Sequence, residues 1–169
     1  MKKIILFLIL ILFLSSCGVF NLNDFVLPDD IDFIETIETL NTPEKICAYM
    51  KDNFEYKAHA FYAPDPYTLW KTQKGDCNDF ATFAIFIAHY HGYETYQIRI
   101  FYKNTFSYHV IAVFKENNKY NFSHNQGYFF VEKTTFKEIV LRYFFNYELK
   151  SYKVFDYDMN LIEQNYASW

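Results

Sequence analysis

Apolar positions in the first half of the chain repeat with helical spacing. They recur every three residues from Ile31 to Leu40, which predicts a short amphipathic helix. Thr42 and Pro43 predict the start of a second helix, since threonine caps helix N-termini and proline suits the first helical position. Residues 77–90 are helical in pattern and nearly free of charge, and Gly92 ends the run. Such a helix must be buried on most sides.

Alternating patterns follow this helix and predict strands. Residues 95–102 alternate, residues 108–114 form a second strand, and Asn117-Asn118 predicts a hairpin turn before a third strand over residues 119–123. Thr134-Thr135 predicts the start of another helix, and residues 152–157 a last strand. Helices followed by an antiparallel meander predict an α+β fold.

The N-terminal residues have the pattern of a secretory signal. Two lysines precede an apolar run over residues 4–14, which is too short to span a bilayer, since that takes about 20 residues. The ending "LSSC" resembles the bacterial lipobox, in which the cysteine becomes lipidated and then N-terminal; an ordinary signal peptide or an uncleaved anchor is the alternative. We therefore expect a lipoprotein signal over residues 1–16, lipidation of Cys17, and a lipid-anchored, extracytoplasmic protein of the cell envelope.

Composition and charge limit the number of domains and the partners. A chain of 169 residues, 51% hydrophobic and 22% aromatic, supports one domain with a buried core. We expect residues 17–42 to form a tether with a short helix and residues 43–169 to form the domain. The formal net charge is −4, so a mildly acidic domain gives no electrostatic reason to expect nucleic-acid binding. Attachment to the membrane should come from the N-terminal lipid.

The segment Gly75–Asp79 places a cysteine at the predicted start of the 77–90 helix. The thiolate is the reactive form of cysteine, and the partial positive charge at a helix N-terminus lowers the pKa of a thiol. The aspartates on either side of Cys77 act in the opposite direction, because nearby negative charge disfavours a thiolate. A nucleophilic Cys77 therefore needs a basic partner. A disulfide to Cys47 is the alternative, and it would block the thiol.

His109 is the partner that the pattern favours. His89 and His91 lie near the other end of the Cys77 helix, about 20 Å away at 1.5 Å per residue, and suit capping of its C-terminus. His59 falls in a loop that the pattern does not place. His109 opens the second strand, where it is either a base that meets Cys77 or a structural histidine.

The segments GDCNDFA, GYETYQIRI and YHVIAVF, in this order, resemble the bacterial transglutaminase-like cysteine enzymes. The preceding TPEKICAYMKDNFEY helix extends the resemblance over residues 43–125. The resemblance implies a papain-type α+β core, with a buried nucleophile helix packed on an antiparallel sheet. It implies Cys77 as the nucleophile and His109 as the general base of acyl transfer or of amide or peptide hydrolysis. A protein or peptide, or cell-envelope material, would be the substrate.

The resemblance also implies an aspartate at the end of the third strand, where this chain has no carboxylate. Ser123 aligns best with that position, and the Asn125 amide is chemically the better substitute. A two-residue hairpin loop would put His124 on the face of His109, whereas a longer loop with a bulge would put Ser123 and Asn125 there.

The missing carboxylate leaves a second function open, because an imidazolium without it is less stabilised. This alternative is a catalytically weakened or inactive module that binds peptide or cell-envelope material. A structural lipoprotein with a Tyr-rich contact surface is a third class. We expect no cofactor and no metal, since neither a CxxC motif nor an acidic loop with calcium-ligand spacing is present.

Overall fold

The structure, a computed structural model, describes residues 22–59, 64–105, 108–145 and 148–166. The helices are η1 (Leu22–Asp24), α2 (Ile31–Thr39), α3 (Pro43–Asn53), α4 (Pro66–Thr72), α5 (Cys77–Tyr90) and α6 (Phe136–Phe144). The strands are β1 (Glu55–Tyr56), β2 (Lys74–Gly75), β3 (Glu94–Tyr102), β4 (Tyr108–Glu116), β5 (Lys119–His124), β6 (Gly127–Lys133), β7 (Leu149–Phe155) and β8 (Leu161–Tyr166). The predicted α+β class is confirmed. The predicted signal and Cys17 lie outside the described residues.

Three helices begin at capping residues that the sequence predicts. The Thr42 hydroxyl accepts a hydrogen bond from a backbone N–H of α3, and Pro43 is the first helical residue. Asp76 caps α5 and Thr135 caps α6 in the same way. Gly92 follows α5 with a φ of 83°, a left-handed conformation that glycine adopts without strain. Local sequence thus sets where these helices begin and end.

The main sheet has six strands in the order β6-β5-β4-β3-β7-β8, and neighbouring strands are antiparallel. Asn117 and Asn118 form the loop between β4 and β5, with φ of 51° and 61°, as a tight two-residue hairpin requires. The pairing runs without a bulge from Glu116 with Lys119 to Ala112 with Ser123. This register decides which side chains of β5 lie on the same face as His109.

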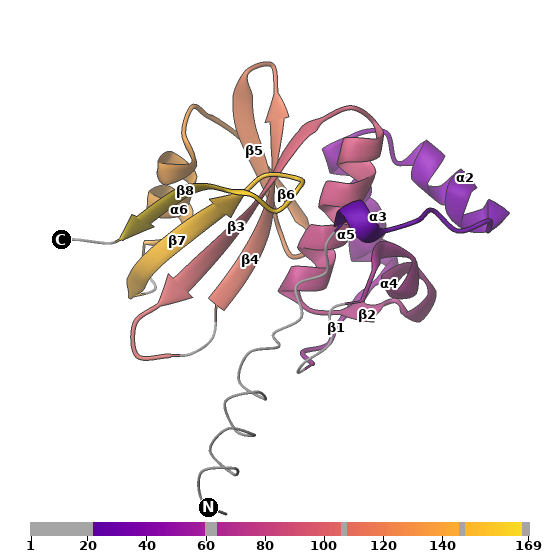
Figure 1. The fold of residues 1–169 in the computed structure, drawn as a ribbon, viewed down its shortest axis with the longest axis horizontal. Coiled ribbons are helices and arrows are strands. Elements are labelled where there is room, and N and C mark those ends of the chain that lie inside the picture. Colours follow the sequence, from indigo (N-terminus) through magenta and orange to yellow (C-terminus); the bar gives the residue numbers. More distant parts are fainter. Residues whose placement is uncertain (1–21, 60–63, 106–107, 146–147, 167–169) are drawn as a thin grey trace, which may run out of the picture.

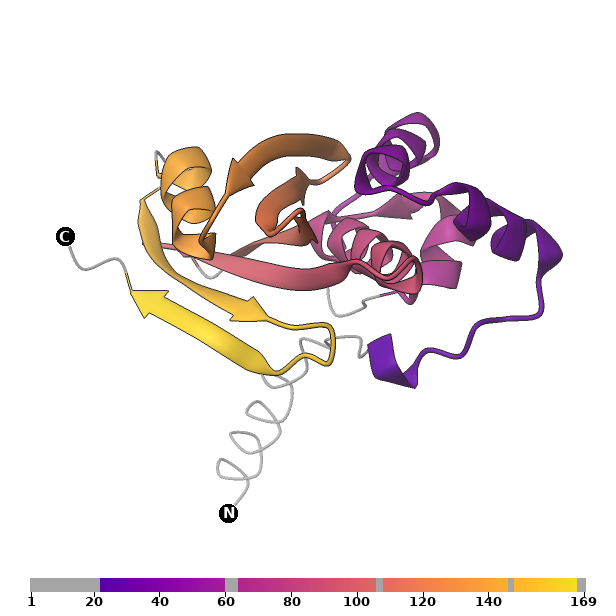
Figure 2. The same cartoon turned by 90° about the horizontal axis from the view of Figure 1, so that it is seen from above.

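Helices cover both faces of this sheet. α5 packs on β3 and β4, and Ala112 of β4 belongs to the core on that side. The next residues on either side, Ile111 and Val113, belong to a second core that includes α6. Figure 1 shows α2, α3, α4 and α5 gathered at one side of the molecule, and Figure 2 shows α6 standing apart from them against the strands.

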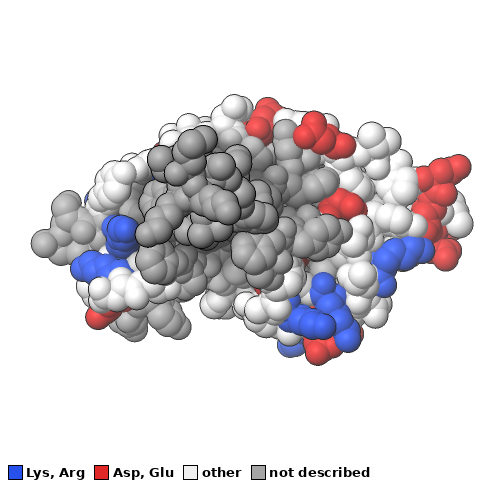
Figure 3. Space-filling view, turned by 60° about the horizontal axis from the view of Figure 1, so that its bottom comes forward, with Lys and Arg blue, Asp and Glu red and all other residues white. Residues whose placement is uncertain are grey.

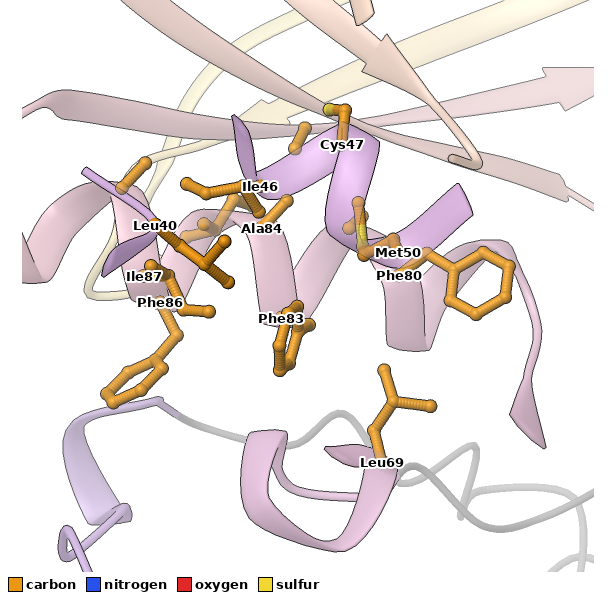
Figure 4. Close-up of a cluster of buried hydrophobic side chains, with 14 of the residues drawn as sticks. Leu40, Ile46, Cys47, Met50, Leu69, Phe80, Phe83, Ala84, Phe86 and Ile87 are labelled. Carbon is orange, nitrogen blue, oxygen red and sulfur yellow. The ribbon is translucent and has the colours of Figure 1, made fainter. Parts of the chain in front are cut away.

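α5 runs through the centre of the larger core. Residues 79–88 of this helix are all buried. Figure 4 shows Ile46 and Met50 of α3 lying against the side chains of α5, with Leu69 of α4 on another side. Because the whole length of α5 is packed, its first residue, Cys77, has a defined position relative to the sheet.

The predicted helix α2 packs into the core, although it was expected within a tether. Its Phe33 and Ile37 are fully buried in the core beside α5. Other elements have no signal in the sequence pattern. The strands β1, β2, β6 and β8 were not predicted at all. β1 and β2 have two residues each, and β6 and β8 are edge strands without a buried residue. Such strands carry little hydrophobic alternation, so their hydrogen-bonding neighbours define them.

Charges of both signs are mixed on the described surface. In Figure 3, Lys and Arg residues lie beside Asp and Glu residues, and neither sign forms a continuous field on that face. Ion pairs account for part of this mixing, including Lys71 with Asp30 at 2.8 Å and Lys115 with Glu94 at 2.7 Å. Within the described ranges, no helix has the length and apolar character needed to cross a membrane.

Candidate active site

A capping box holds Cys77 at the first turn of α5. The Asp76 side chain accepts a hydrogen bond from the backbone N–H of Asn78 at 2.9 Å, and the Asp79 carboxylate accepts one from the backbone N–H of Asp76 at 2.7 Å. Gly75 leaves room for this arrangement, because a Cβ there would lie 2.8 Å from Asp79 Oδ2. The order Gly-Asp-Cys-x-Asp therefore has a local structural cause. It starts the helix tightly and presents the cysteine at its end.

His59, which the sequence left unplaced, lies beside these aspartates. Its Nε2 is 2.5 Å from Asp79 Oδ2 and 3.9 Å from Asp76 Oδ2. Burial raises the pKa of Asp79 to about 6. Burial also acts against the charged form of His59, but the Asp79 hydrogen bond and the two carboxylate charges outweigh it and raise the pKa of His59. The pair therefore adds a histidine to the capping residues at the start of the Cys77 helix.

The Cys77 thiol is protonated in its resting state. Burial raises its pKa to about 11, and the charges of Asp76 and Asp79 act in the same direction. The predicted opposition of the flanking aspartates to a thiolate is thus confirmed. The backbone N–H groups of Val110 and Asn78 lie near the sulfur and lower the pKa, but less than burial raises it. Val110 directly follows His109, so the sulfur reaches the beginning of β4.

His109 and Cys77 line the same cavity, which has a volume of about 360 Å³. His109 lies in β4 opposite Ile100 of β3, beyond the point where the β4–β5 pairing stops. Its Nε2 is buried and has no hydrogen-bond partner among the described residues. Burial, and to a lesser extent the neighbouring His124, lower the pKa of His109 to about 4. The other residues that line the cavity are Tyr56, Tyr102, Tyr108, His124 and Phe144.

His124 lies next to His109, whereas Ser123 lies on the opposite face of the sheet. The ring centroids of the two histidines are 4.6 Å apart. Because Ser123 pairs with Ala112, its side chain points to the opposite face of the sheet, where it is 1% exposed and lies beside Cys47. The expectation for Ser123 is wrong for this reason.

Asn125 does not continue the alternation of β5. It follows the end of β5 in the turn to β6, where its φ is 51°. Its side-chain Oδ1 is buried and has no hydrogen-bond partner among the described residues. The alternation of β5 therefore fixes the faces of Ser123 and His124 but does not extend to Asn125, whose role stays a prediction.

The remaining cysteine and histidines have structural surroundings. Cys47 and Cys77 are both free, so the alternative of a disulfide between them is excluded. His91 is the C-cap residue of α5, and its Nε2 lies 2.8 Å from the carbonyl oxygen of Ile37 in α2. His89 stacks on Tyr157 with ring centroids 3.6 Å apart. A larger cavity of about 560 Å³ adjoins His89, at the opposite end of α5 from Cys77.

One group of described side chains has the donor types of a metal site. His59, Asp76 and Asp79 bring three donor atoms within 4.8 Å of one another. Each of these residues already has a structural partner, since the aspartates cap α5 and His59 pairs with Asp79. The positions of all three are therefore explained without an ion.

Cys77 at the start of α5 and His109 near the start of β4 line one cavity in an α+β core. The family model of the transglutaminase-like superfamily matches residues 34–132, more than half of the chain. The protein therefore belongs to the transglutaminase-like superfamily. No curated protein matches the chain. The matched region includes Cys77, His109 and His124, and it begins within α2.

Proposed function

We propose that the protein is a thiol enzyme that transfers or hydrolyses acyl groups through a dyad of Cys77 and His109. The observation that carries this proposal is the shared cavity. In it, the buried His109 Nε2 has no hydrogen-bond partner within the described ranges, and the Cys77 sulfur reaches Val110, the next residue of the same strand. An imidazole with a free nitrogen in such a cavity can accept the thiol proton at the moment of attack.

The reaction would proceed through a thioester. Cys77 sulfur attacks the carbonyl carbon of a side-chain or peptide amide while His109 accepts the thiol proton. The carbon–nitrogen bond then breaks, and His109 returns the proton to the leaving amine. Water or a second amine next attacks the thioester carbon and gives its proton to His109, and the thiol is restored as the acid or new amide leaves. The substrate would be a protein, a peptide or cell-envelope material.

The resting charges favour a general-base mechanism over a preformed ion pair. The pKa of the thiol is raised to about 11 and that of His109 is lowered to about 4, so both groups are neutral near pH 7. A thiolate–imidazolium pair would have to form against both shifts. Slow turnover is the consequence. The same observation favours the second candidate, a weakened or inactive module that binds peptide or cell-envelope material in this cavity.

Thiol labelling separates these two functions. A neutral thiol-directed probe should label Cys77 in the wild type, and a His109→Ala variant should label at least about tenfold more slowly at pH 7. His89→Ala, which removes an exposed histidine from the far end of the same helix, should label like the wild type. Release of ammonia from glutamine peptides would identify the enzyme. Equal labelling of the wild type and His109→Ala would refute the dyad.

We also propose that Cys17 is lipidated and anchors the protein in the cell envelope. The sequence "LSSC" after a short apolar run supports this proposal. Metabolic labelling with a fatty-acid analogue should mark the protein, and Cys17→Ser should abolish the label. Loss of labelling in Cys77→Ser, with Cys17→Ser still labelled, would show that the lipid is elsewhere.

A further inference from the structure

A second imidazole lies where an orienting group for His109 would be needed. His124 is the last residue of β5, and its ring lies 4.6 Å from that of His109, centroid to centroid, at an interplanar angle of 74°. Because Ser123 pairs with Ala112, the adjacent His124 projects from the same face of the sheet as His109. A shift of one residue would turn every buried side chain of β5 to the wrong face, so the packing of the sheet maintains this proximity.

The two imidazoles share largely apolar surroundings. The Phe144 ring of α6 lies 5.6 Å from that of His124 and 6.0 Å from that of His109, and Phe129 of β6 lies 6.3 Å from that of His124. Burial lowers the pKa of His124 as well. The other titratable groups that line the cavity are a thiol and three phenols, those of Cys77, Tyr56, Tyr102 and Tyr108. The nearest carboxylates, Asp76 and Asp79, act on Cys77 from outside the cavity lining.

We propose that His124 is the positioning residue of His109. A neutral imidazole has one N–H donor and one acceptor nitrogen. His124 accepts the ring N–H of His109, which leaves the other nitrogen of His109 directed at the Cys77 proton. The two rings already touch edge to face. This inference rests on the proposed function, since His109 must act as the base.

A histidine in this role differs from a carboxylate in one respect. It can hold the orientation and tautomer of His109, but in its neutral form it adds no negative charge to stabilise an imidazolium. The site is therefore expected to contain a well-oriented but weak base. Replacing His124 with a carboxylate should strengthen that base, whereas replacing it with an apolar ring should remove the orientation.

Variants of His124 in the full-length chain, purified in detergent, test this role. His124→Phe keeps a ring but has no acceptor, His124→Asn keeps an acceptor, and His124→Asp adds a charge. Ser123→Ala, a neighbour on the opposite face, is the matched control. The two readouts are the alkylation rate of Cys77 by iodoacetamide across pH and the pKa of His109 from ring-labelled histidine NMR.

His124→Phe should lower the alkylation rate at pH 7 at least about tenfold, while His124→Asn and Ser123→Ala stay within about threefold of the wild type. His124→Asp should raise the pKa of His109 by about one unit or more, and the alkylation rate with it. Wild-type rates in His124→Phe, or an unchanged His109 titration in a folded His124→Asp, would overturn the inference. If His109→Ala is also without effect, the proposed function itself fails. An effect of His109→Ala alone would overturn only the role of His124.

Discussion

Acidification should destabilise the protein through His109. The folded protein keeps this imidazole neutral down to about pH 4, because burial lowers its pKa, whereas the unfolded chain protonates it near the ordinary value of 6.5. Between these pH values the unfolded state binds more protons, so the free energy of unfolding falls as the pH falls. The difference between 6.5 and about 4 corresponds to about 3 kcal/mol, a large part of a typical domain's stability.

A variant isolates this contribution from the other titrating groups. His109→Gln removes the titration and keeps a polar side chain. Asp79 also affects the pH dependence of the wild-type stability. Its raised pKa of about 6 makes acidification favour the folded state over part of the same pH range. Asp79 is present in both proteins, so its contribution cancels when their stabilities are subtracted.

Urea unfolding at several pH values between 7 and 4.5 measures the effect. The stability of the wild type minus that of His109→Gln should fall by about 2–3 kcal/mol over this range. His89→Gln, at the exposed end of α5, is the matched control, and its difference from the wild type should stay constant. Parallel curves for the wild type and His109→Gln, within about 0.5 kcal/mol, would show that His109 is not buried in its neutral form.

Three further substitutions test the packing that holds the site. Gly75→Ala should lower the free energy of unfolding by about 1–3 kcal/mol, because its Cβ would lie 2.8 Å from Asp79 Oδ2. A urea unfolding curve identical to that of the wild type would contradict this close approach. Phe83→Ala, at a fully buried position in α5, should lower the free energy of unfolding by about 3–5 kcal/mol. The control Phe130→Ala, at an exposed position of β6, should leave it nearly unchanged. Thr135→Ala should cost about 1 kcal/mol in thermal unfolding by removing the α6 cap; an unchanged Tm would mean that the cap contributes nothing.

Local signals predicted much of the fold because local interactions produce it. Thr42, Asp76 and Thr135 cap helices in the structure, since a side-chain oxygen next to free backbone N–H groups needs no distant partner. The Asn117-Asn118 hairpin formed as expected for the same reason, because asparagine tolerates the positive φ of a tight turn. The exposed edge strands β6 and β8 were missed because their pairing depends on neighbours that the local pattern does not reveal.

The sequence pattern does not decide which residue at the end of β5 lies beside His109. The resemblance favours Ser123 by alignment and Asn125 by side-chain chemistry, whereas a two-residue loop favours His124. The bulge-free pairing turns Ser123 toward the other core and brings His124 to His109. Asn117-Asn118 between two alternating runs favours a two-residue loop. This preference is the sequence signal that points to His124.

The pairing of His59 with Asp79 is set by tertiary structure alone. His59 is 20 residues from Asp79 in a loop without periodic pattern, yet their side chains form an ion pair at the start of α5. Nothing local to His59 indicates this partner.

By itself, the sequence determined the starts of α3, α5 and α6, the tight hairpin and the superfamily. These features depend on residues close together in the chain or on a recognisable order of motifs. Only the tertiary structure decided that Cys77 and His109 share a cavity, that burial keeps both neutral, and that His124 is the neighbour of His109. Register and desolvation depend on how distant segments pack, so no local pattern contains them.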